Sequence, residues 1–129
     1  MADVDVTLRY ARLAPRKARA VIDLIRGKRV AWAESYLATV PRKAARMIAK
    51  LLHSGIAAAK AKKLVEQELS VTKAFVQEGP RLKRARSHFR GTIRPIDKQM
   101  SHITLVLSDE RLDNEELGIK KKKRVEARQ

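Results

Sequence analysis

Several residue classes are absent or scarce in this sequence. Without cysteine, the chain has no disulfide framework and no thiolate metal site. Aromatic residues make up only 4% of it, which leaves few rings for stacking the bases of an extended strand. No apolar run approaches the ~20 residues that cross a bilayer. The first residues, MADVDVTLRY, begin acidic and contain no apolar signal region. We therefore expect a soluble, intracellular protein.

Acidic residues are the other scarce class. The 129 residues contain 30 Lys+Arg against 14 Asp+Glu, which gives a formal net charge of +16. A chain of this length forms one domain with one modest core. The mutual repulsion of this excess positive charge opposes compaction of the chain and favours an acidic polymer as partner. Nucleic acid and an anionic membrane surface are the two candidates.

An enzyme is not indicated by the sequence. The three histidines, His53, His88 and His102, fall on a predicted helix, a hairpin tip and a strand start, without the carboxylate spacing of a metal site or proton relay. The segment RGKR at 26–29 lacks the leading glycine and the Ser/Thr of a phosphate-binding loop. We predict no catalytic residue, no metal and no cofactor.

The N-terminal half predicts one strand and three helices. Alternation predicts a strand over 4–10, with Val4, Val6, Leu8 and Tyr10 on one face. Pro15 opens a helix that Gly27 stops in a left-handed conformation. Its apolar residues recur at i, i+3, i+4 and i+7: Ala18, Val21, Ile22 and Ile25. A second, short helix has the same spacing in Ala33, Tyr36, Leu37 and Val40.

The third predicted helix, over roughly 41–63, is the longest. Its buried stripe consists of Ala44, Ile48, Leu51, Leu52, Gly55 and Ala59. Its charged side chains are all basic: Arg42, Lys43, Arg46, Lys50, Lys60, Lys62 and Lys63. A solvated helix normally mixes charge signs to gain i,i+4 pairs. The charge on this helix therefore indicates an anionic partner.

Two further strands are predicted, over 69–77 and 101–107. Alternation in the first places Leu69, Val71, Lys73 and Phe75 on one face and Thr72, Ala74 and Val76 on the other. Between the strands, residues 79–100 contain seven basic residues and one acid, Asp97. Antiparallel pairing puts the fold-back near His88, with Gly91 able to supply a positive φ. Each arm then projects roughly 30 Å, against a radius of gyration of about 14 Å for the domain. The hairpin therefore extends beyond the domain, and we expect a partner outside the protein to hold it.

The type of partner follows from charge and from the aromatic positions. Residues 1–64 hold 15 Lys+Arg and 4 acids, so two regions of one charge sign are available to phosphates. Four of the five aromatic residues, Tyr10, Trp32, Tyr36 and Phe75, lie on core-like patterns, which leaves Phe89 at the hairpin tip. Recognition of folded RNA through phosphates and shape is favoured over an extended strand.

Two other partners remain open. Duplex DNA is the main alternative, because the helices around Gly27 faintly resemble a helix-turn-helix. Its second helix, however, carries Trp32, Glu34 and Tyr36 and few base-reading donors. A membrane surface needs bulky apolar anchors, whereas the third helix has an alanine-rich face.

Several blocks of the sequence resemble one protein family. The blocks are LAPRKARAVIDLIRGK (13–28), PRKAAR (41–46), VTKAFVQEGPRLKRAR (71–86), RG (90–91) and MSHITLVL (100–107). In order and spacing they resemble the bacterial large-subunit ribosomal protein of family twenty-two, over nearly everything before residue 108. The chain departs from the family pattern mainly in the hairpin, at Ala85, Ser87, His88, Phe89, Pro95 and Asp97.

The resemblance implies a fold and a place of action. The fold is α+β, with three helices packed on a three-stranded antiparallel sheet and a long protruding β-hairpin over about 79–100. The function implied is that of a structural constituent of the cytoplasmic ribosome. The protein would bind 23S rRNA near the peptide exit tunnel, and its hairpin would line the tunnel wall near the family-four large-subunit protein and the nascent peptide. The alternative is a basic DNA-binding nucleoid or regulatory protein.

Site residues are carried over where motifs match. The implied rRNA-binding residues are Arg16, Lys17, Arg19, Arg26, Lys28, Lys43, Arg46, Lys83, Arg84, Arg86, Arg90 and Lys98. The implied tunnel-lining tip comprises Arg86, Ser87, His88, Phe89, Arg90 and Gly91. We expect residues 1–108 to form one RNA-binding domain and residues 109–129 to form a charged, flexible tail.

Overall fold

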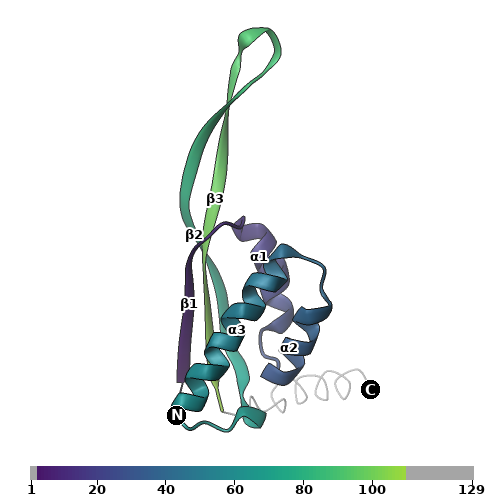
Figure 1. The fold of residues 1–129 in the computed structure, drawn as a ribbon, viewed down its shortest axis with the longest axis vertical. Coiled ribbons are helices and arrows are strands. Elements are labelled where there is room, and N and C mark those ends of the chain that lie inside the picture. The colour runs from purple at the N-terminus through teal and green to yellow at the C-terminus, as the bar shows by residue number, and fades with distance from the viewer. Residues whose placement is uncertain (1–2, 110–129) are drawn as a thin grey trace, which may run out of the picture.

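The computed structural model describes residues 3–109, so the tail predicted beyond them lies outside the described residues. The elements are β1 (Asp3–Ala11), α1 (Pro15–Ile25), α2 (Val30–Thr39), α3 (Lys43–Ala61), the 3₁₀ turn η1 (Glu66–Glu68), β2 (Ser70–Ser87), the 3₁₀ turn η2 (Phe89–Gly91) and β3 (Ile93–Ser108). The sheet is antiparallel with the order β1-β3-β2. This is the predicted α+β fold (Figure 1).

The helices form where local signals predict them. Pro15 occupies the first turn of α1, and Gly27 has φ 74°, the left-handed conformation expected of a helix stop. Helix α3 begins at Lys43 rather than residue 41, and every residue of its predicted stripe is buried, with Ala45 and Ile56 in addition. The apolar periodicity therefore identified the core-facing sides of these helices.

The core lies between the helices and one face of the sheet. Helices α1 and α3 pack on the sheet, and α2 packs on α3 (Figure 1). Ile22, Ile48 and Leu52 from the helices and Ile103 and Leu105 from β3 are all fully buried. Among residues 3–109, no helix covers the opposite face of the sheet (Figure 1). The body is thus two layers thick, with one covered sheet face.

Strand β2 contradicts the predicted assignment of faces. Val71 pairs with Leu107, but the next paired residue is Lys73, opposite Val106, so Thr72 is the extra residue of a β-bulge. After the bulge, Ala74 and Val76 face the core and Phe75 is exposed. The predicted grouping of Val71 with Lys73 and Phe75 is wrong because the bulge reverses which residues point inward.

The core-like positions predicted for the aromatic residues are also mostly wrong. Tyr10, Trp32 and Phe75 are exposed, as is Phe89 at the hairpin tip, whereas Tyr36 is partly buried against the core. Tyr10 lies within the register shift between Leu8 and Ala11 and has a left-handed φ of 55°, so its side chain does not continue the alternation of β1. The exposed rings are therefore accessible to a partner. Their small number, rather than burial, limits the stacking of bases on them.

The outer edge of β2 is covered by the segment that joins α1 to α2. Gly27 N donates to Val71 O over 2.8 Å, Val71 N donates to Lys28 O over 2.9 Å, and Val30 N donates to Leu69 O over 3.0 Å. An open strand edge is a template for unwanted pairing. Here the connection pairs with the backbone at the start of this edge, at Leu69 and Val71, and fixes the end of α1 beside β2.

Beyond the body, β2 and β3 continue as a two-stranded hairpin that projects far past the helices (Figure 1). The register runs without a shift from Arg81↔Gln99 to Ser87↔Ile93. Nearly all side chains of this part are exposed. The predicted protruding hairpin is therefore present, and the helices do not cover its outer part.

The hairpin closes at the predicted place. His88 N donates to Thr92 O over 2.7 Å, and Thr92 Oγ1 donates to Phe89 O over 2.6 Å. Gly91 has the expected positive φ of 72°, and Arg90 also adopts a left-handed φ of 54°. A non-glycine residue at positive φ is uncommon. The turn thus holds Phe89 and Arg90 outward at the tip.

Candidate nucleic-acid interface

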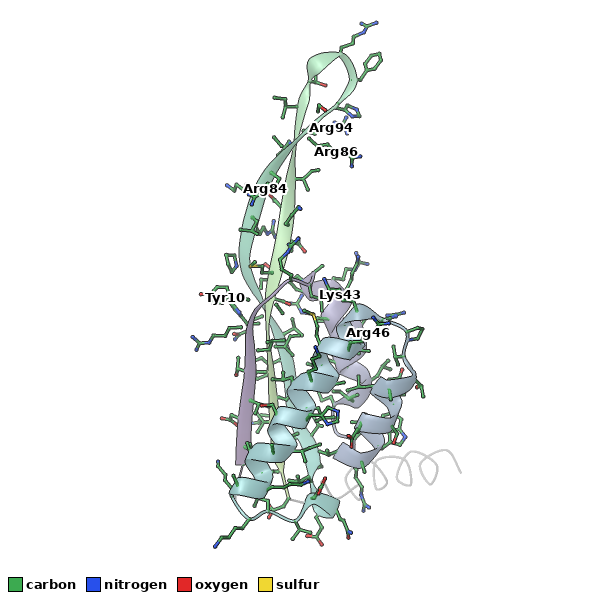
Figure 2. The ribbon with its side chains drawn as sticks, viewed as in Figure 1. Tyr10, Lys43, Arg46, Arg84, Arg86 and Arg94 are labelled. Carbon is green, nitrogen blue, oxygen red and sulfur yellow. The ribbon has the colours of Figure 1, made fainter. Side chains whose placement is uncertain are left out.

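Basic side chains gather where the hairpin leaves the body. Lys43 Nζ donates to Arg12 O over 3.2 Å, and Arg12 Nη1 donates to Gln99 O over 3.3 Å. These contacts link the start of α3, the connection between β1 and α1, and β3 at the foot of the hairpin. Figure 2 shows Lys43 and Arg46 at this end of α3. We call this cluster the hairpin base. It consists of Arg12, Arg16, Lys17, Lys43 and Arg46.

The electrostatics of the hairpin base favour an anion. All five of its side chains are exposed, and within residues 3–109 none of them forms an ion pair. Neither α1 nor α3 has an acidic residue in its first turn. The positive end of each helix dipole therefore adds to the charge of the side chains rather than being offset. Phosphate groups are suited to this surface.

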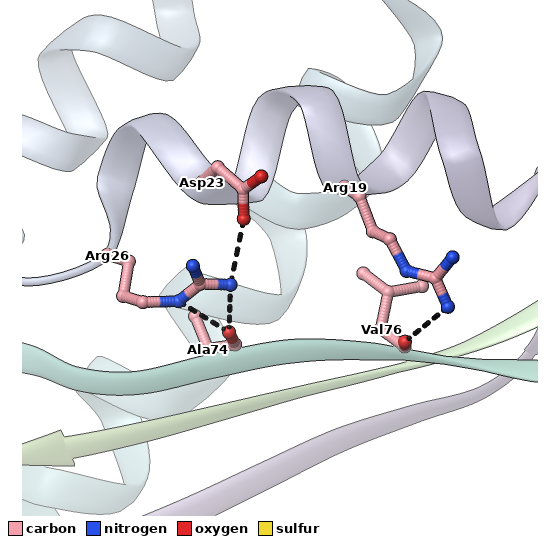
Figure 3. A network of polar contacts seen from close by, with 5 residues as sticks. All are labelled: Arg19, Asp23, Arg26, Ala74 and Val76. Atoms are coloured by element: carbon pink, nitrogen blue, oxygen red, sulfur yellow. Dashed lines mark hydrogen bonds and ion pairs between the residues drawn. The ribbon is translucent and has the colours of Figure 1, made fainter.

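Arg19 and Arg26, which were predicted to bind rRNA, are turned toward β2 (Figure 3). Arg26 donates to Ala74 O from Nε over 2.9 Å and from Nη2 over 2.7 Å, and it pairs with Asp23 over 2.8 Å. Arg19 Nη2 donates to Val76 O over 3.2 Å. Both guanidinium groups therefore bind backbone carbonyl groups of β2 beyond the part that pairs with the connection between α1 and α2. Their first role in the folded chain is structural.

Lys28 lies at the other end of α1 and is not part of the hairpin base. Its Nζ is 5.6 Å from the centroid of the Trp32 ring, which stacks on Tyr36 at 5.0 Å with an interplanar angle of 6°. A cation over an aromatic face is attracted to the ring. The fold thus separates Lys28 from Arg16 and Lys17, although all three were predicted from one sequence block.

The hairpin carries the remaining predicted residues along its exposed length: Lys83, Arg84, Arg86, Arg90 and Lys98. The ion pairs of the hairpin in the described chain both involve Arg81, whose side chain is 3.6 Å from Asp97 and 3.9 Å from Glu78. Arg90 lies over the Phe89 ring with 5.0 Å from Cζ to the centroid. The tip therefore presents an aromatic ring and a cation together.

Motif matching missed Arg94. It pairs directly with Arg86 across the hairpin, and Figure 2 shows both on the projecting part with Arg84. Motif matching overlooked Arg94 because no block of the family pattern includes it. The sequence indicated only a fold-back near His88, whereas the observed register is centred at residue 90 and places Arg94 directly opposite Arg86.

The histidine and acidic side chains of residues 3–109 lie apart from one another or in pairs. This part of the chain contains no group of three or more His, Cys, Asp or Glu that would hold a metal ion. His53 Nδ1 is 3.3 Å from Glu34 Oε1 between α3 and α2, and His102 Nδ1 accepts from Tyr10 N. Among the same residues, no helix combines the length and apolarity needed to cross a membrane.

Comparisons with known proteins agree with this geometry. A family model described as ribosomal protein L22p/L17e matches residues 6–108. The chain is 44% identical over 108 residues to the large ribosomal subunit protein uL22 of Opitutus terrae, covering 83% of this chain and 96% of the relative. The protein of the same name from Halothermothrix orenii is 45% identical over 104 residues, covering 80% and 92%. The Lacticaseibacillus casei protein is 48% identical over 104 residues, covering 80% and 89%.

Proposed function

The chain belongs to the ribosomal protein L22p/L17e family, and we propose that it is a structural constituent of the large ribosomal subunit that binds 23S rRNA. The proposed site of binding is near the peptide exit tunnel of the cytoplasmic ribosome. The protein performs no chemistry. Its role is to neutralise phosphates where rRNA segments converge and to insert its hairpin among them.

One observation carries this proposal. An exposed surface of basic residues runs from the hairpin base along a two-stranded hairpin that the helices do not cover. An isolated two-stranded hairpin is marginal in water, so both its shape and its charge are explained by a surrounding polyanion. Folded RNA can surround a projecting element with phosphates on several sides at once. A flat anionic surface could contact only one side of the hairpin.

The tunnel location is the finer part of the proposal. Arg86, Ser87, His88, Phe89, Arg90 and Gly91 form the part of the hairpin farthest from the body. We propose that this tip lines the tunnel wall, beside the family-four large-subunit protein and the passing nascent peptide. The body then supplies most of the binding energy from outside, and the tip acts on the passage.

DNA binding is the second candidate function. Helices α1 and α2 flank Gly27 as the two helices of a helix-turn-helix would. However, α2 carries few side chains suited to reading base edges. Its exposed residues include Trp32, which stacks on Tyr36, and Glu34, which pairs with His53. Base-edge reading in the major groove is typically performed by Arg, Lys, Asn and Gln. RNA binding is therefore favoured.

The test is co-sedimentation with large subunits in high salt, followed by crosslinking of the protein to rRNA. The protein should remain with the large subunit after loosely bound DNA-binding proteins have left, and its crosslinks should fall in 23S rRNA. Recovery in the nucleoid fraction, without rRNA crosslinks, would support the DNA alternative instead.

Two matched variants locate the footprint on the body. Arg16→Gln/Arg46→Gln removes two charges from the hairpin base, and Lys60→Gln/Lys62→Gln removes two charges from the opposite end of α3. The first should reduce the magnitude of the log–log salt slope of 23S rRNA binding by roughly 0.7 to 0.9 for each phosphate that is no longer neutralised. The second should change it much less. Equal effects would show that the hairpin base is not the main footprint.

A further inference from the structure

The two faces of the hairpin differ in charge. Directly opposed residues share a face, and so do residues two apart along a strand. The register therefore puts three cross-strand pairs on one face: Leu82 with Lys98, Arg84 with Ile96, and Arg86 with Arg94. We call these six residues the basic face, because it holds four cations and no acid. The other face holds the pairs Arg81 with Gln99, Lys83 with Asp97, Ala85 with Pro95 and Ser87 with Ile93, which include two cations and one acid.

The opposition of Arg86 and Arg94 is unfavourable within the protein itself. Like charges directly opposite on a sheet destabilise the pairing. Within residues 3–109, neither side chain has an ion pair or a hydrogen bond, and both are exposed. Asp97, the one acid of the hairpin arms, points to the opposite face and pairs there with Arg81. The basic face is thus without a counter-charge at its outermost pair.

The geometry of this pair suits one kind of ligand. Opposed residues have Cβ atoms about 4.5 to 5.5 Å apart, so two arginine side chains can converge on a single group. Each guanidinium presents a planar fork of donors that matches a phosphate in a bidentate way. The other cations of the face, Arg84 and Lys98, follow at intervals of about 6.6 Å along the strands. This is a row of donors rather than a diffuse charge.

We propose that Arg86 and Arg94 together clamp one backbone phosphate of rRNA, and that Arg84 and Lys98 continue the contact along the basic face. This assignment rests on the proposed RNA-binding function and makes it specific. The phosphate supplies the negative charge that the opposed arginines lack, so the outer hairpin is ordered by its ligand. An acidic segment of a neighbouring protein is the competing occupant.

The experiment is phosphate-alkylation footprinting of 23S rRNA in large subunits assembled with the full-length protein. Arg86→Gln and Arg94→Gln should each expose the same rRNA phosphate, because both side chains hold it. Lys83→Gln is the matched control, because it removes one charge from the other face of the same hairpin. It should leave that phosphate protected.

A second variant separates loss of the ligand from loss of the hairpin. Arg94→Glu places an acid opposite Arg86, which favours cross-strand pairing in the free protein, and it should nevertheless expose the phosphate. In addition, Arg86→Gln/Arg94→Gln should lower the magnitude of the salt slope by roughly 0.7 to 0.9 in total, the value for one phosphate. A decrease near twice that value would indicate two separate phosphates and overturn the clamp.

The remaining outcomes distinguish failure of the phosphate clamp from failure of the proposed RNA-binding function. If the arginine variants expose no phosphate or different phosphates, while Arg16→Gln/Lys17→Gln still exposes its own, RNA binding stands and the clamp is wrong. If these arginines crosslink to an acidic protein segment instead, the clamp is equally wrong. If the wild-type protein protects no rRNA phosphate at all, the proposed function itself fails.

Discussion

The backbone N–H of Tyr10 donates to Nδ1 of His102 over 3.0 Å, and the two rings meet edge to face with centroids 4.9 Å apart. Tyr10 holds a left-handed φ of 55° while its side chain is 61% exposed. This arrangement follows the register shift between Leu8 and Ala11. The end of β1 is therefore bent at a position where the backbone of a tyrosine is strained and its ring is held outward.

The strain at Tyr10 predicts that a glycine variant is more stable than an alanine variant at this position, the reverse of the usual order in a strand. In a left-handed conformation, a residue with a Cβ costs about 1 to 2 kcal/mol, whereas glycine does not. Tyr10→Gly should therefore be more stable than Tyr10→Ala by about 1 kcal/mol, as measured by denaturant unfolding of the isolated protein.

Thr7 provides the control for this comparison, because it lies in regular β1 opposite Thr104. There, glycine should be less stable than alanine by about 0.5 to 1 kcal/mol. The same order of stability at both positions would show that the bend at Tyr10 is absent in solution.

Arg26 should contribute to stability more than to RNA binding. Its two hydrogen bonds to Ala74 O are charge-assisted, but its side chain is 46% exposed, so Arg26→Gln should cost only about 1 kcal/mol. Arg16→Gln, which breaks no contact within the described chain, should change the unfolding free energy by less than about 0.5 kcal/mol. Thermal unfolding of both variants tests this, and an equal loss of stability would contradict it.

Gly55 should not tolerate a methyl group. A Cβ at this position would lie 2.8 Å from Leu107 Cδ1 and 3.2 Å from Val6 Cγ2, and Leu107 is fully buried. Overpacking costs about 1 to 3 kcal/mol, against a gain of about 1 kcal/mol in helix propensity. Gly55→Ala should therefore destabilise the protein, as measured by denaturant unfolding.

A double variant checks the cause. Leu107→Val removes the atom in closest contact, so its effect combined with Gly55→Ala should be smaller than the sum of the two separate effects. Ser54→Ala, on the exposed side of α3, should be near neutral. Simple additivity of the two core substitutions would argue that Gly55 is sensitive for another reason.

The outer hairpin should exchange its amide protons quickly in the free protein. Residues 84–93 have few buried neighbours and like charges along the basic face, whereas residues 71–76 belong to the packed sheet. Hydrogen exchange of the isolated protein should show protection in the second segment and little in the first. Comparable protection in both would mean that the hairpin needs no partner.

The tip can be shortened without disturbing the register. Replacing the five residues from His88 to Thr92 by Asn-Gly closes the Ser87↔Ile93 pair with a two-residue turn. Under the proposed function the body supplies most of the binding energy, so occupancy of the protein in purified large subunits should stay normal. Passage of nascent chains and sensitivity to inhibitors that bind in the tunnel should change.

Two results would contradict that expectation in different ways. Normal occupancy with unchanged nascent-chain and inhibitor behaviour would show that the tip does not reach the tunnel. Reduced occupancy would show that the tip is an anchor for assembly. Occupancy and translation must therefore be measured on the same particles.

Local signals in the sequence predicted much of this fold. Pro15 and Gly27 mark the ends of the first helix region because both act through their own backbone preferences. The faces of β2 were predicted wrongly after Thr72, because a bulge is decided by pairing with β3 and not by alternation along β2.

The candidate site was predicted unevenly for the same reason. Exposed cations of the hairpin were found from composition and motif, but the roles of Arg19 and Arg26 depend on the nearby edge of β2. Arg94 was missed because its importance comes from the residue opposite it. Relationships across strands require the register, which no stretch of the sequence contains on its own.

The continuity of β2 and β3 from sheet to hairpin places a parity rule on the length of the hairpin. Removing one opposed pair, Lys83 with Asp97, would turn the Arg86–Arg94 pair to the other side of the ribbon, since side chains alternate with a period of two. Removing two neighbouring pairs would shorten the hairpin by about 6.6 Å and restore the original direction. Changes in hairpin length that preserve its contacts should therefore occur as even numbers of pairs, while odd numbers exchange its two sides.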